Sequence, residues 1–302
     1  MAGTATLVSN KKGTVPFLRR ASTTVIVLMA AMPLAAQKVG PATGALVIVG
    51  GAMRDPAIVT RFIELAGGPD APIVIIPTAG DAATYDQYWS GLRVFRDNGA
   101  RNLTVLHTRD PKVADTAAFV EPITRARGVF FAGGRQWRLA DAYLKTRTHK
   151  ELEALLARGG VIGGSSAGAT ILGSFLVRGD TKGNELMIGD HVEGLAFLKN
   201  SAIDQHVLRR NRQFDLVEVM QKHPDLLGLG IDEDTAVVVE GDRFEVIGRS
   251  YVLVHDKDTT ISTHGSFFFM APGDRFDLVA REATRRETKD AALEHVRKHK
   301  KP

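Results

Sequence analysis

One serine lies in a glycine-rich turn that would expose its hydroxyl group as a nucleophile. Residues 164–168 have the sequence Gly-Ser-Ser-Ala-Gly, so Ser166 is the central residue of a G-x-S-x-G pattern. Small residues permit a sharp turn from a strand into a helix, and the amides that follow would stabilise a developing oxyanion. The alternative is a turn that only packs against its neighbours or binds a phosphate group.

A nucleophilic serine needs a base and an acid that orients the base. Among the nine histidines, His206 is the strongest candidate for the base, because it follows an Asp-Gln pair and precedes three arginines. The acid is expected within residues 232–234, Asp-Glu-Asp, and spacing alone does not select one of the three. The chain order of serine, histidine and acid differs from the orders in α/β-hydrolases, chymotrypsin and subtilisin.

Other chemistries fit the sequence less well. The chain has no cysteine, which excludes thiol nucleophiles and cysteine-ligated metals. No G-x-G-x-x-G opens a helix after the first strand, and no Walker A motif occurs. A metalloenzyme built on Asp190, His191 and Glu193 is an alternative, but this cluster lacks the H-E-x-x-H spacing. We therefore expect neither a metal nor a cofactor.

Short apolar runs alternate with helical stretches from residue 45 onward. Five such runs are 45–49, 73–76, 103–106, 128–131 and 160–162. Each run is followed by a Gly, Thr or Ser residue or lies close to such a residue. Such runs are typical of parallel strands covered by helices on both faces, with ligands bound beyond their carboxyl ends. Three later runs are separated by tight turns: 235–240, 243–247 and 250–255. The prediction is an α/β fold with a predominantly parallel sheet flanked by helices and a C-terminal β-meander.

The first 36 residues have the composition of a secretory signal peptide. They carry four basic residues, no acid and an apolar stretch at 25–32, and cleavage is expected near Ala36. A bilayer span needs about 20 apolar residues, so we expect a secreted or periplasmic protein without stable membrane insertion. An uncleaved membrane anchor is the alternative. The catalytic domain is then predicted over residues 37–280.

The net charge of +5 arises from the two ends of the chain. Residues 281–302 hold eight basic and four acidic residues, and they predict a charged tail that forms a surface helix or a frayed end. Without this tail and the first 36 residues, 27 basic and 30 acidic residues remain. The slightly acidic body argues against a nucleic-acid partner.

Four motifs, taken in order, resemble the cyanophycinase branch of the S51 serine peptidases. They are Phe-Phe-Ala-Gly-Gly-Arg-Gln at 130–136, Gly-Ser-Ser-Ala-Gly-Ala at 164–169, Asp-Gln-His at 204–206 and Gly-Ile-Asp-Glu-Asp-Thr-Ala at 230–236. The resemblance covers about residues 45–270 and implies a fold related to class I glutamine amidotransferases. It also implies Ser166 as nucleophile, His206 as base and Glu233 as the acid.

The resemblance further assigns residues to the oxyanion hole and the substrate pocket. It implies that the backbone N–H groups of Gly134 and Ala167 form the oxyanion hole. Four residues would line the pocket: Gln136, Asp204, Gln205 and Arg212. Members of the family often form homodimers, so a homodimer is expected as well.

The function implied by the resemblance is hydrolysis of aspartyl-linked peptide bonds. Cyanophycinases release dipeptides from a polymer of β-linked aspartyl-arginine, and other members are aspartyl dipeptidases. Two departures bear on the substrate: Arg135 replaces a common acid, and Phe214-Asp215-Leu216 replaces the usual Gly-Arg-Leu. The alternatives are an aspartyl or isoaspartyl dipeptidase and a binding protein that keeps the fold but lacks catalysis.

Overall fold

The computed structural model describes residues 1–4, 38–257 and 265–286. Residues 1–35 and 36–302 form separate units, and every described helix and strand belongs to the second. The predicted signal peptide therefore lies almost wholly outside the described residues. No helix within the described ranges is long and apolar enough to cross a bilayer.

A nine-stranded mixed sheet forms the larger layer, in the order β14-β13-β10-β9-β1-β5-β4-β2-β3. Its parallel half consists of β1 (Ala45–Val49), β5 (Val161–Ser165), β4 (Gly128–Phe131), β2 (Ile73–Ile76) and β3 (Leu103–Val105). Its antiparallel half consists of β9 (Thr235–Glu240), β10 (Arg243–Gly248), β13 (Arg275–Asp277) and β14 (Glu282–Thr284). The predicted α/β fold with a parallel core is confirmed.

A second sheet of five strands has the order β12-β11-β8-β7-β6. Its members are β6 (Gly173–Phe175), β7 (Leu198–Gln205), β8 (Leu227–Ile231), β11 (Val252–His255) and β12 (Phe268–Met270). The strands β6, β7 and β8 run parallel to one another, whereas β11 and β12 are antiparallel additions. The chain passes from this sheet to the larger one in the turn between β8 and β9.

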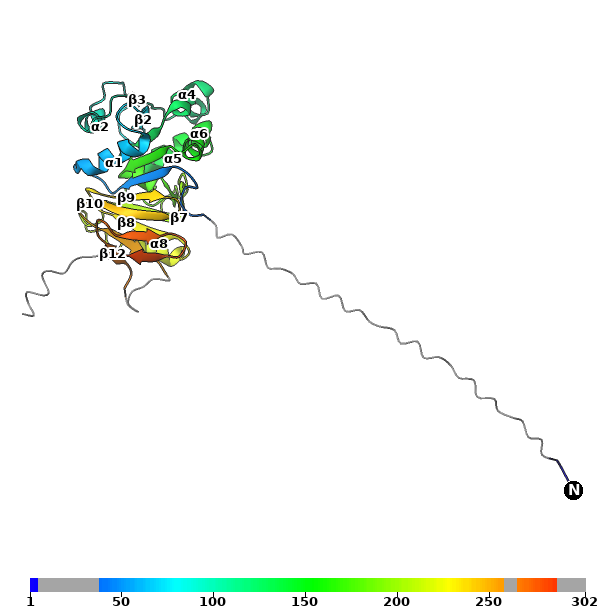
Figure 1. Cartoon of the computed structure of the whole chain (residues 1–302). Helices are drawn as coiled ribbons and strands as arrows, with labels where there is room; N and C mark the ends of the chain where they lie inside the picture. Colours follow the sequence, from blue (N-terminus) through cyan, green and yellow to red (C-terminus); the bar gives the residue numbers. More distant parts are fainter. Residues whose placement is uncertain (5–37, 258–264, 287–302) are drawn as a thin grey trace, which may run out of the picture. The chain divides into compact units, whose positions relative to one another are not determined.

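Helices cover the larger sheet on both faces (Figure 1). They are α1 (Pro56–Ala66), the 3₁₀ helix η1 (Ser90–Leu92), α2 (Arg93–Asp97), α3 (Pro111–Ala114), α4 (Ala117–Arg125), α5 (Gln136–Tyr143), α6 (Arg147–Ala157) and α7 (Ala167–Thr170). Helix α8 (Leu216–Lys222) packs instead against the five-stranded sheet, on β7, β8 and β11. Helix α1 shows how local sequence sets these elements. Asp55 caps its first turn by accepting from the Ala57 amide, Pro56 occupies the first position, and Gly67 ends it in a left-handed conformation.

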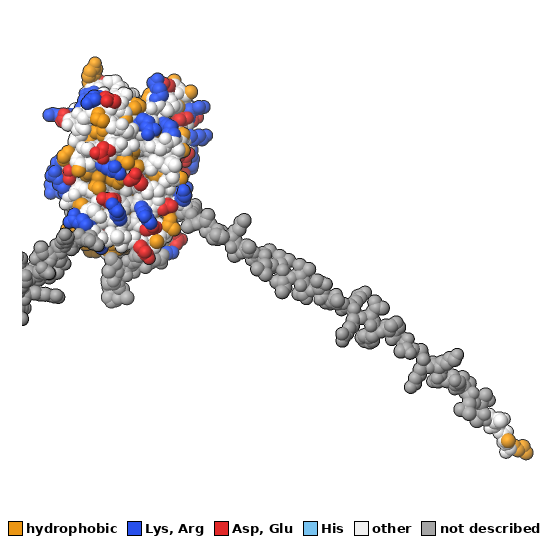
Figure 2. Space-filling view, in the orientation of Figure 1, with side chains coloured by type: hydrophobic (Ala, Val, Ile, Leu, Met, Phe, Trp, Pro, Cys, Tyr) orange, Lys and Arg blue, Asp and Glu red, His pale blue; other side chains and the backbone are white. Residues whose placement is uncertain are grey.

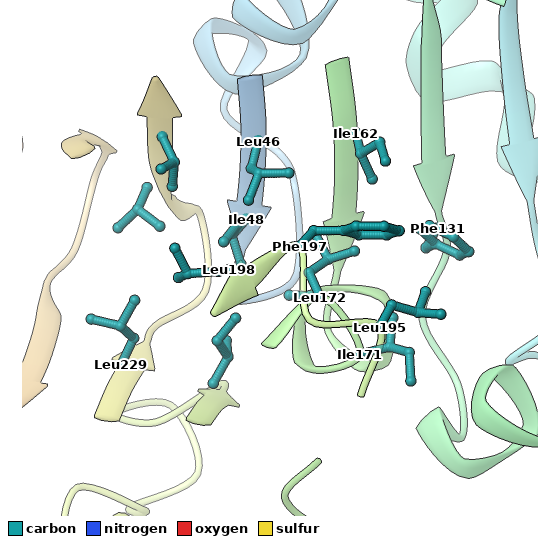
Figure 3. Close-up of a cluster of buried hydrophobic side chains, with 14 of the residues drawn as sticks. Leu46, Ile48, Phe131, Ile162, Ile171, Leu172, Leu195, Phe197, Leu198 and Leu229 are labelled. Carbon is teal, nitrogen blue, oxygen red and sulfur yellow. The ribbon is translucent and has the colours of Figure 1, made fainter. Parts of the chain in front are cut away.

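Alternate residues of β1 enter two different cores, as expected for a strand covered on both faces. Val47 packs with α1 and α2 in one core, whereas Leu46 and Ile48 pack with α4, α5 and α6 in the other. The second core continues into the five-stranded sheet through residues such as Leu229. Figure 3 shows part of this shared core, in which Leu46, Ile48 and Leu198 belong to the same cluster.

Two details of the C-terminal prediction are wrong. The third run of the expected meander, β11, leaves the larger sheet and pairs with β8, where all four of its residues are buried. The start of the expected tail is also part of the fold, because β14 pairs with β13. Arg281 and Arg285 bind the buried carboxylates of Asp256 and Asp274, at 3.1 and 2.7 Å. Alternation identifies a strand, but it does not say which sheet the strand joins.

Charged side chains of both signs are interspersed over the face shown in Figure 2. Many belong to exposed ion pairs, such as Arg101 with Asp70 and Lys222 with Glu218. Pairs of this kind contribute about 0–1 kcal/mol each, so the fold depends on its buried cores rather than on surface charge.

Candidate active site

Ser166 lies in a sharp turn at the carboxyl end of β5. The strand ends at Ser165 and α7 begins at Ala167, which leaves Ser166 between them with φ 56° and ψ −119°. Such a conformation costs on the order of 1–3 kcal/mol and is retained where the surroundings enforce it. Here the Ser166 amide donates to the Val49 carbonyl oxygen at 3.0 Å. A Cβ atom at Gly164 would lie 2.0 Å from the carbonyl oxygen of Gly168, so the turn closes only with glycine at this position.

His206 approaches the serine from the second sheet. It directly follows β7, has φ 55°, and donates its amide hydrogen to the Gly50 carbonyl oxygen at 2.9 Å. The imidazole lies against Gly51, where a Cβ atom would come within 2.2 Å of Cε1. The two residues after β1 therefore position the histidine through a backbone hydrogen bond and close contact.

The third member of the site, Glu233, lies in the turn that joins β8 to β9. His206 Nδ1 lies 2.8 Å from Glu233 Oε1, and His206 Nε2 lies 2.9 Å from Ser166 Oγ. A carboxylate only accepts hydrogen bonds, so Nδ1 carries the proton and Nε2 can accept from the serine hydroxyl. The three side chains thus form one hydrogen-bonded chain, with the histidine side chain only 9% exposed.

The two neighbouring acids, Asp232 and Asp234, have other hydrogen-bond partners. Asp232 accepts from two backbone amides of the turn after β7 and from the Ser250 hydroxyl. Asp234 accepts from Arg54, through the backbone amide at 2.5 Å and through Nε at 2.8 Å. Of the three acids, only Glu233 is hydrogen-bonded to the imidazole in the described structure.

Arg54 belongs to the site, and the sequence analysis missed it. Its Nη2 lies 3.5 Å from Glu233 Oε2 while its Nε binds Asp234, so it braces the turn that carries the acid. The available signal was its position shortly after β1, because polar residues at the carboxyl ends of parallel strands gather at one edge of the sheet.

The loop after β4 lies beside the serine, since a Cβ atom at Gly133 would lie 3.2 Å from Ser166 Cβ and 3.6 Å from Ser166 Oγ. Gly134 has φ 143°, and a Cβ atom there would lie 2.1 Å from the Ala79 carbonyl oxygen. The same oxygen accepts from the amide of Arg135 at 2.8 Å. Across the described ranges, no group of the chain accepts a hydrogen bond from the amide of Gly134 or Ala167. These two donors are therefore available to a ligand at the serine.

The pKa of His206 is lowered from its ordinary value. Burial lowers it most, the hydrogen bond to Glu233 opposes this, and the positive charge of Arg210 lowers it further. The imidazole is consequently neutral and able to accept a proton at neutral pH. Arg210 is a second residue that the sequence analysis did not assign to the site.

Of the four residues expected in the pocket, Gln136, Asp204 and Gln205 are buried and Arg212 is half-buried, and their contacts differ. Gln136 donates to the carbonyl oxygens of Val177 and Arg178, and its own Oε1 has no partner in the described chain. Gln205 Oε1 and Arg212 Nη1 are likewise buried without a described partner. Asp204 differs, because Arg178 binds both of its carboxylate oxygens at 2.8 and 3.0 Å. The carboxylate of Asp204 is thus engaged by Arg178, and its place in the substrate pocket stays a prediction.

The cluster considered as an alternative metal site is divided between two sets of contacts. His191 lies between Asp190 and Asp141, at 2.9 Å from each, whereas Glu193 pairs with Lys145 at 2.7 Å. Within the described residues, no group of three His, Asp or Glu side chains is arranged to hold a metal ion.

Comparison with solved structures places this fold among known ones. A peptidase from an acI-B1 Actinobacterium superposes with a TM-score of 0.62 at 22% identity, covering 79% of this chain and 98% of that one. A Listeria monocytogenes protein, named as a candidate peptidase E, gives 0.50 at 18% identity over 69% and 100% of the two chains. At these identities the likeness concerns the fold.

Sequence comparison identifies the family. The chain is 34% identical over 231 residues to the cyanophycinase of Geminocystis herdmanii, covering 73% of this chain and 84% of the relative. It is 34% identical over 221 residues to that of Thermosynechococcus vestitus, covering 70% and 68% of the two chains. The model of peptidase family S51 matches residues 46–247. This chain therefore belongs to peptidase family S51.

Proposed function

We propose that this chain is a serine-type peptidase that cleaves aspartyl-linked peptide bonds and acts as an exopeptidase on a β-linked aspartyl-arginine polymer, releasing dipeptides. The observation that carries the proposal is the hydrogen-bonded chain from Ser166 through His206 to Glu233. Similarity to cyanophycinases supports the choice of substrate.

In the proposed reaction, Ser166 Oγ attacks the scissile carbonyl carbon and His206 Nε2 takes the hydroxyl proton. Glu233 holds the imidazole in the required tautomer and stabilises its charged form. The amides of Gly134 and Ala167 donate to the oxyanion. His206 then protonates the leaving amine, and an ester remains on Ser166. A water molecule, deprotonated by His206, hydrolyses that ester and restores the enzyme.

The polar groups around the site suggest how a substrate is oriented. The unpartnered Oε1 atoms of Gln136 and Gln205 are acceptors for N–H groups, and Arg212 Nη1 is a donor for a carboxylate. A buried polar atom without a partner costs free energy that a bound substrate would recover. A substrate with both amide or amine donors and a carboxylate meets these requirements.

The function is tested by comparing substrates on the purified full-length chain. We expect dipeptide release from the β-aspartyl-arginine polymer, measured by mass spectrometry, at a higher kcat/KM than hydrolysis of aspartyl and isoaspartyl dipeptides. Turnover of dipeptides alone would instead assign the dipeptidase activity. Absence of turnover, together with failure of a fluorophosphonate probe to label Ser166, would indicate a binding protein.

The pH dependence of kcat/KM follows from the lowered pKa of His206. The neutral imidazole is the active base, so kcat/KM should fall as pH decreases through that pKa, with a midpoint below the ordinary value of 6.5. Arg210→Gln removes a positive charge that disfavours the imidazolium form, so the pKa rises and the acid limb moves to higher pH. The control is Arg209→Gln, and equal shifts in both variants would contradict the assignment to Arg210.

A further inference from the structure

A buried arginine, Arg178, connects the end of β7 with the turn 206–215 that follows this strand. Arg178 is 1% exposed and donates to both carboxylate oxygens of Asp204, which is itself fully buried at the end of β7. Its Nη2 also donates to Asp215 Oδ2, and its Nη1 donates to the Asn184 carbonyl oxygen at 3.0 Å. A buried guanidinium is tolerated only when its donors are satisfied and its charge is balanced, as they are here.

Asp215 makes this contact instead of the one expected from its position. It precedes α8 as the N-cap residue, where an aspartate ordinarily accepts from an amide of the first helical turn. No such side-chain bond is present, and the carboxylate is directed to Arg178. The ion pair thus fixes the end of the turn 206–215, whose start is fixed by Asp232 through the amides of Leu208 and Arg209.

The turn 206–215 also carries Arg212, one of the residues expected in the pocket. Asp215 donates its amide hydrogen to the Arg212 carbonyl oxygen at 3.0 Å, so the two residues move together. Arg212 Nη1 is buried and has no partner among the described groups. Burial lowers the Arg212 pKa first, and the positive charge of Arg178 lowers it further. The two guanidinium groups are therefore close enough to repel, and the carboxylates that bind Arg178 offset this repulsion.

We propose that Arg178 is a positioning residue, which holds the turn 206–215 through Asp215 so that Arg212 binds a substrate carboxylate. The inference rests on the proposed function. It adds a feature of this chain, the ion pair between Arg178 and Asp215, because the usual Gly-Arg-Leu motif has an arginine where Asp215 stands. Arg178 is fully engaged by Asp204 and Asp215, so Arg212 alone of these two arginines is left to bind the carboxylate.

Three variants separate positioning from simple electrostatics: Asp215→Ala, Asp215→Asn and Asp277→Ala. The asparagine loses the charge but keeps an oxygen that can accept from Arg178, whereas the alanine loses both. Asp277 pairs with Arg243 at similar side-chain exposure, 32% against 36%, and serves as the ion-pair control for the activity readouts, whereas its bonds from the Val279 and Ala280 amides exclude it as a stability control. Since Asp215 makes no capping bond, its removal should leave the melting temperature close to that of the parent chain.

The first readout is protection of Ser166 from a fluorophosphonate probe by β-aspartyl-arginine dipeptide. We expect Asp215→Ala to raise the half-protecting concentration about tenfold, a loss equivalent to one weak interaction. Asp215→Asn should raise it less, and the labelling rate without dipeptide should stay within about twofold in both. Equal effects of alanine and asparagine would overturn positioning, because both remove the same charge.

The second readout does not depend on the substrate. Modification of Arg212 by phenylglyoxal, located by peptide mass spectrometry, should be slow in the parent chain because Nη1 is buried, and clearly faster in Asp215→Ala but not in Asp277→Ala. An unchanged rate in Asp215→Ala would overturn the proposal. If the dipeptide gives no protection even in the parent chain while Arg212 modification still accelerates, the proposed substrate is wrong and the positioning role stands.

Discussion

Replacing Ser166 with alanine should reduce kcat on the β-aspartyl-arginine polymer by a factor on the order of 10⁶, the loss seen when a triad nucleophile is removed. The substitution deletes the only atom that can form the ester, while Gly134 and Ala167 keep their amides. Residual hydrolysis from oxyanion stabilisation and binding alone should therefore remain above the uncatalysed rate. The measurement is release of dipeptide under saturating polymer, followed by mass spectrometry.

The neighbouring serine supplies the control for this experiment. Ser165 ends β5 one residue earlier, and its side chain makes no hydrogen bond in the described structure. Ser165→Ala should keep kcat within a few-fold of the parent and should still react with a fluorophosphonate probe. Turnover by Ser166→Ala at the parent rate would remove Ser166 as the nucleophile, whatever the fate of the substrate assignment.

A single methyl group at Gly51 should lower kcat/KM by about 100-fold or more. A Cβ atom at this position would lie 2.2 Å from His206 Cε1 and 2.5 Å from Nδ1, so the imidazole must move by a substantial part of an ångström. Movement breaks the hydrogen bonds to Ser166 and Glu233 together, and misplacement of a catalytic group by about 1 Å can cost a factor of 10². The rate is measured on the same polymer at several pH values.

The positive φ of 136° at Gly51 adds backbone strain to any substitution, so a control must carry strain without the clash. Gly68 has φ 101° and no atom within 4 Å of the place that a Cβ atom would occupy, which makes Gly68→Ala the matched variant. Both substitutions should lower stability by about 1–3 kcal/mol, measured by denaturant unfolding. Only Gly51→Ala should lose activity, and similar losses in both would assign the effect to strain.

The parallel strands and the serine turn are accessible from the sequence because their determinants are local. The runs 45–49, 73–76 and 128–131 coincide with β1, β2 and β4. Apolar residues on both faces of a strand can be identified from a few consecutive positions. The same holds for small residues where a strand turns sharply into a helix. The expectation of an S51 peptidase rests on four short motifs, and the match of the family model to residues 46–247 confirms it.

Pairings between distant segments are not accessible in the same way. The run 250–255 predicts a third strand of a meander with β9 and β10, yet β11 pairs with β8 in the other sheet. The resemblance assigns Asp204 to the substrate pocket, and only the structure shows that its carboxylate pairs with Arg178. In both cases the local pattern is identified correctly, while the partner lies on a segment that no spacing rule selects.

The sequence by itself determined the fold class, the position of Ser166 in a strand-to-helix turn and the candidate status of His206. The tertiary structure decided which of three adjacent acids contacts the imidazole. It also decided that Arg178 binds carboxylates of this chain, whereas Arg212 is left to bind the carboxylate of a substrate. The physical reason is that a side chain's direction depends on strand register and on the crossing between two sheets. At this site the end of β1 joins both, because Val49 binds the serine amide and Gly50 binds the histidine amide.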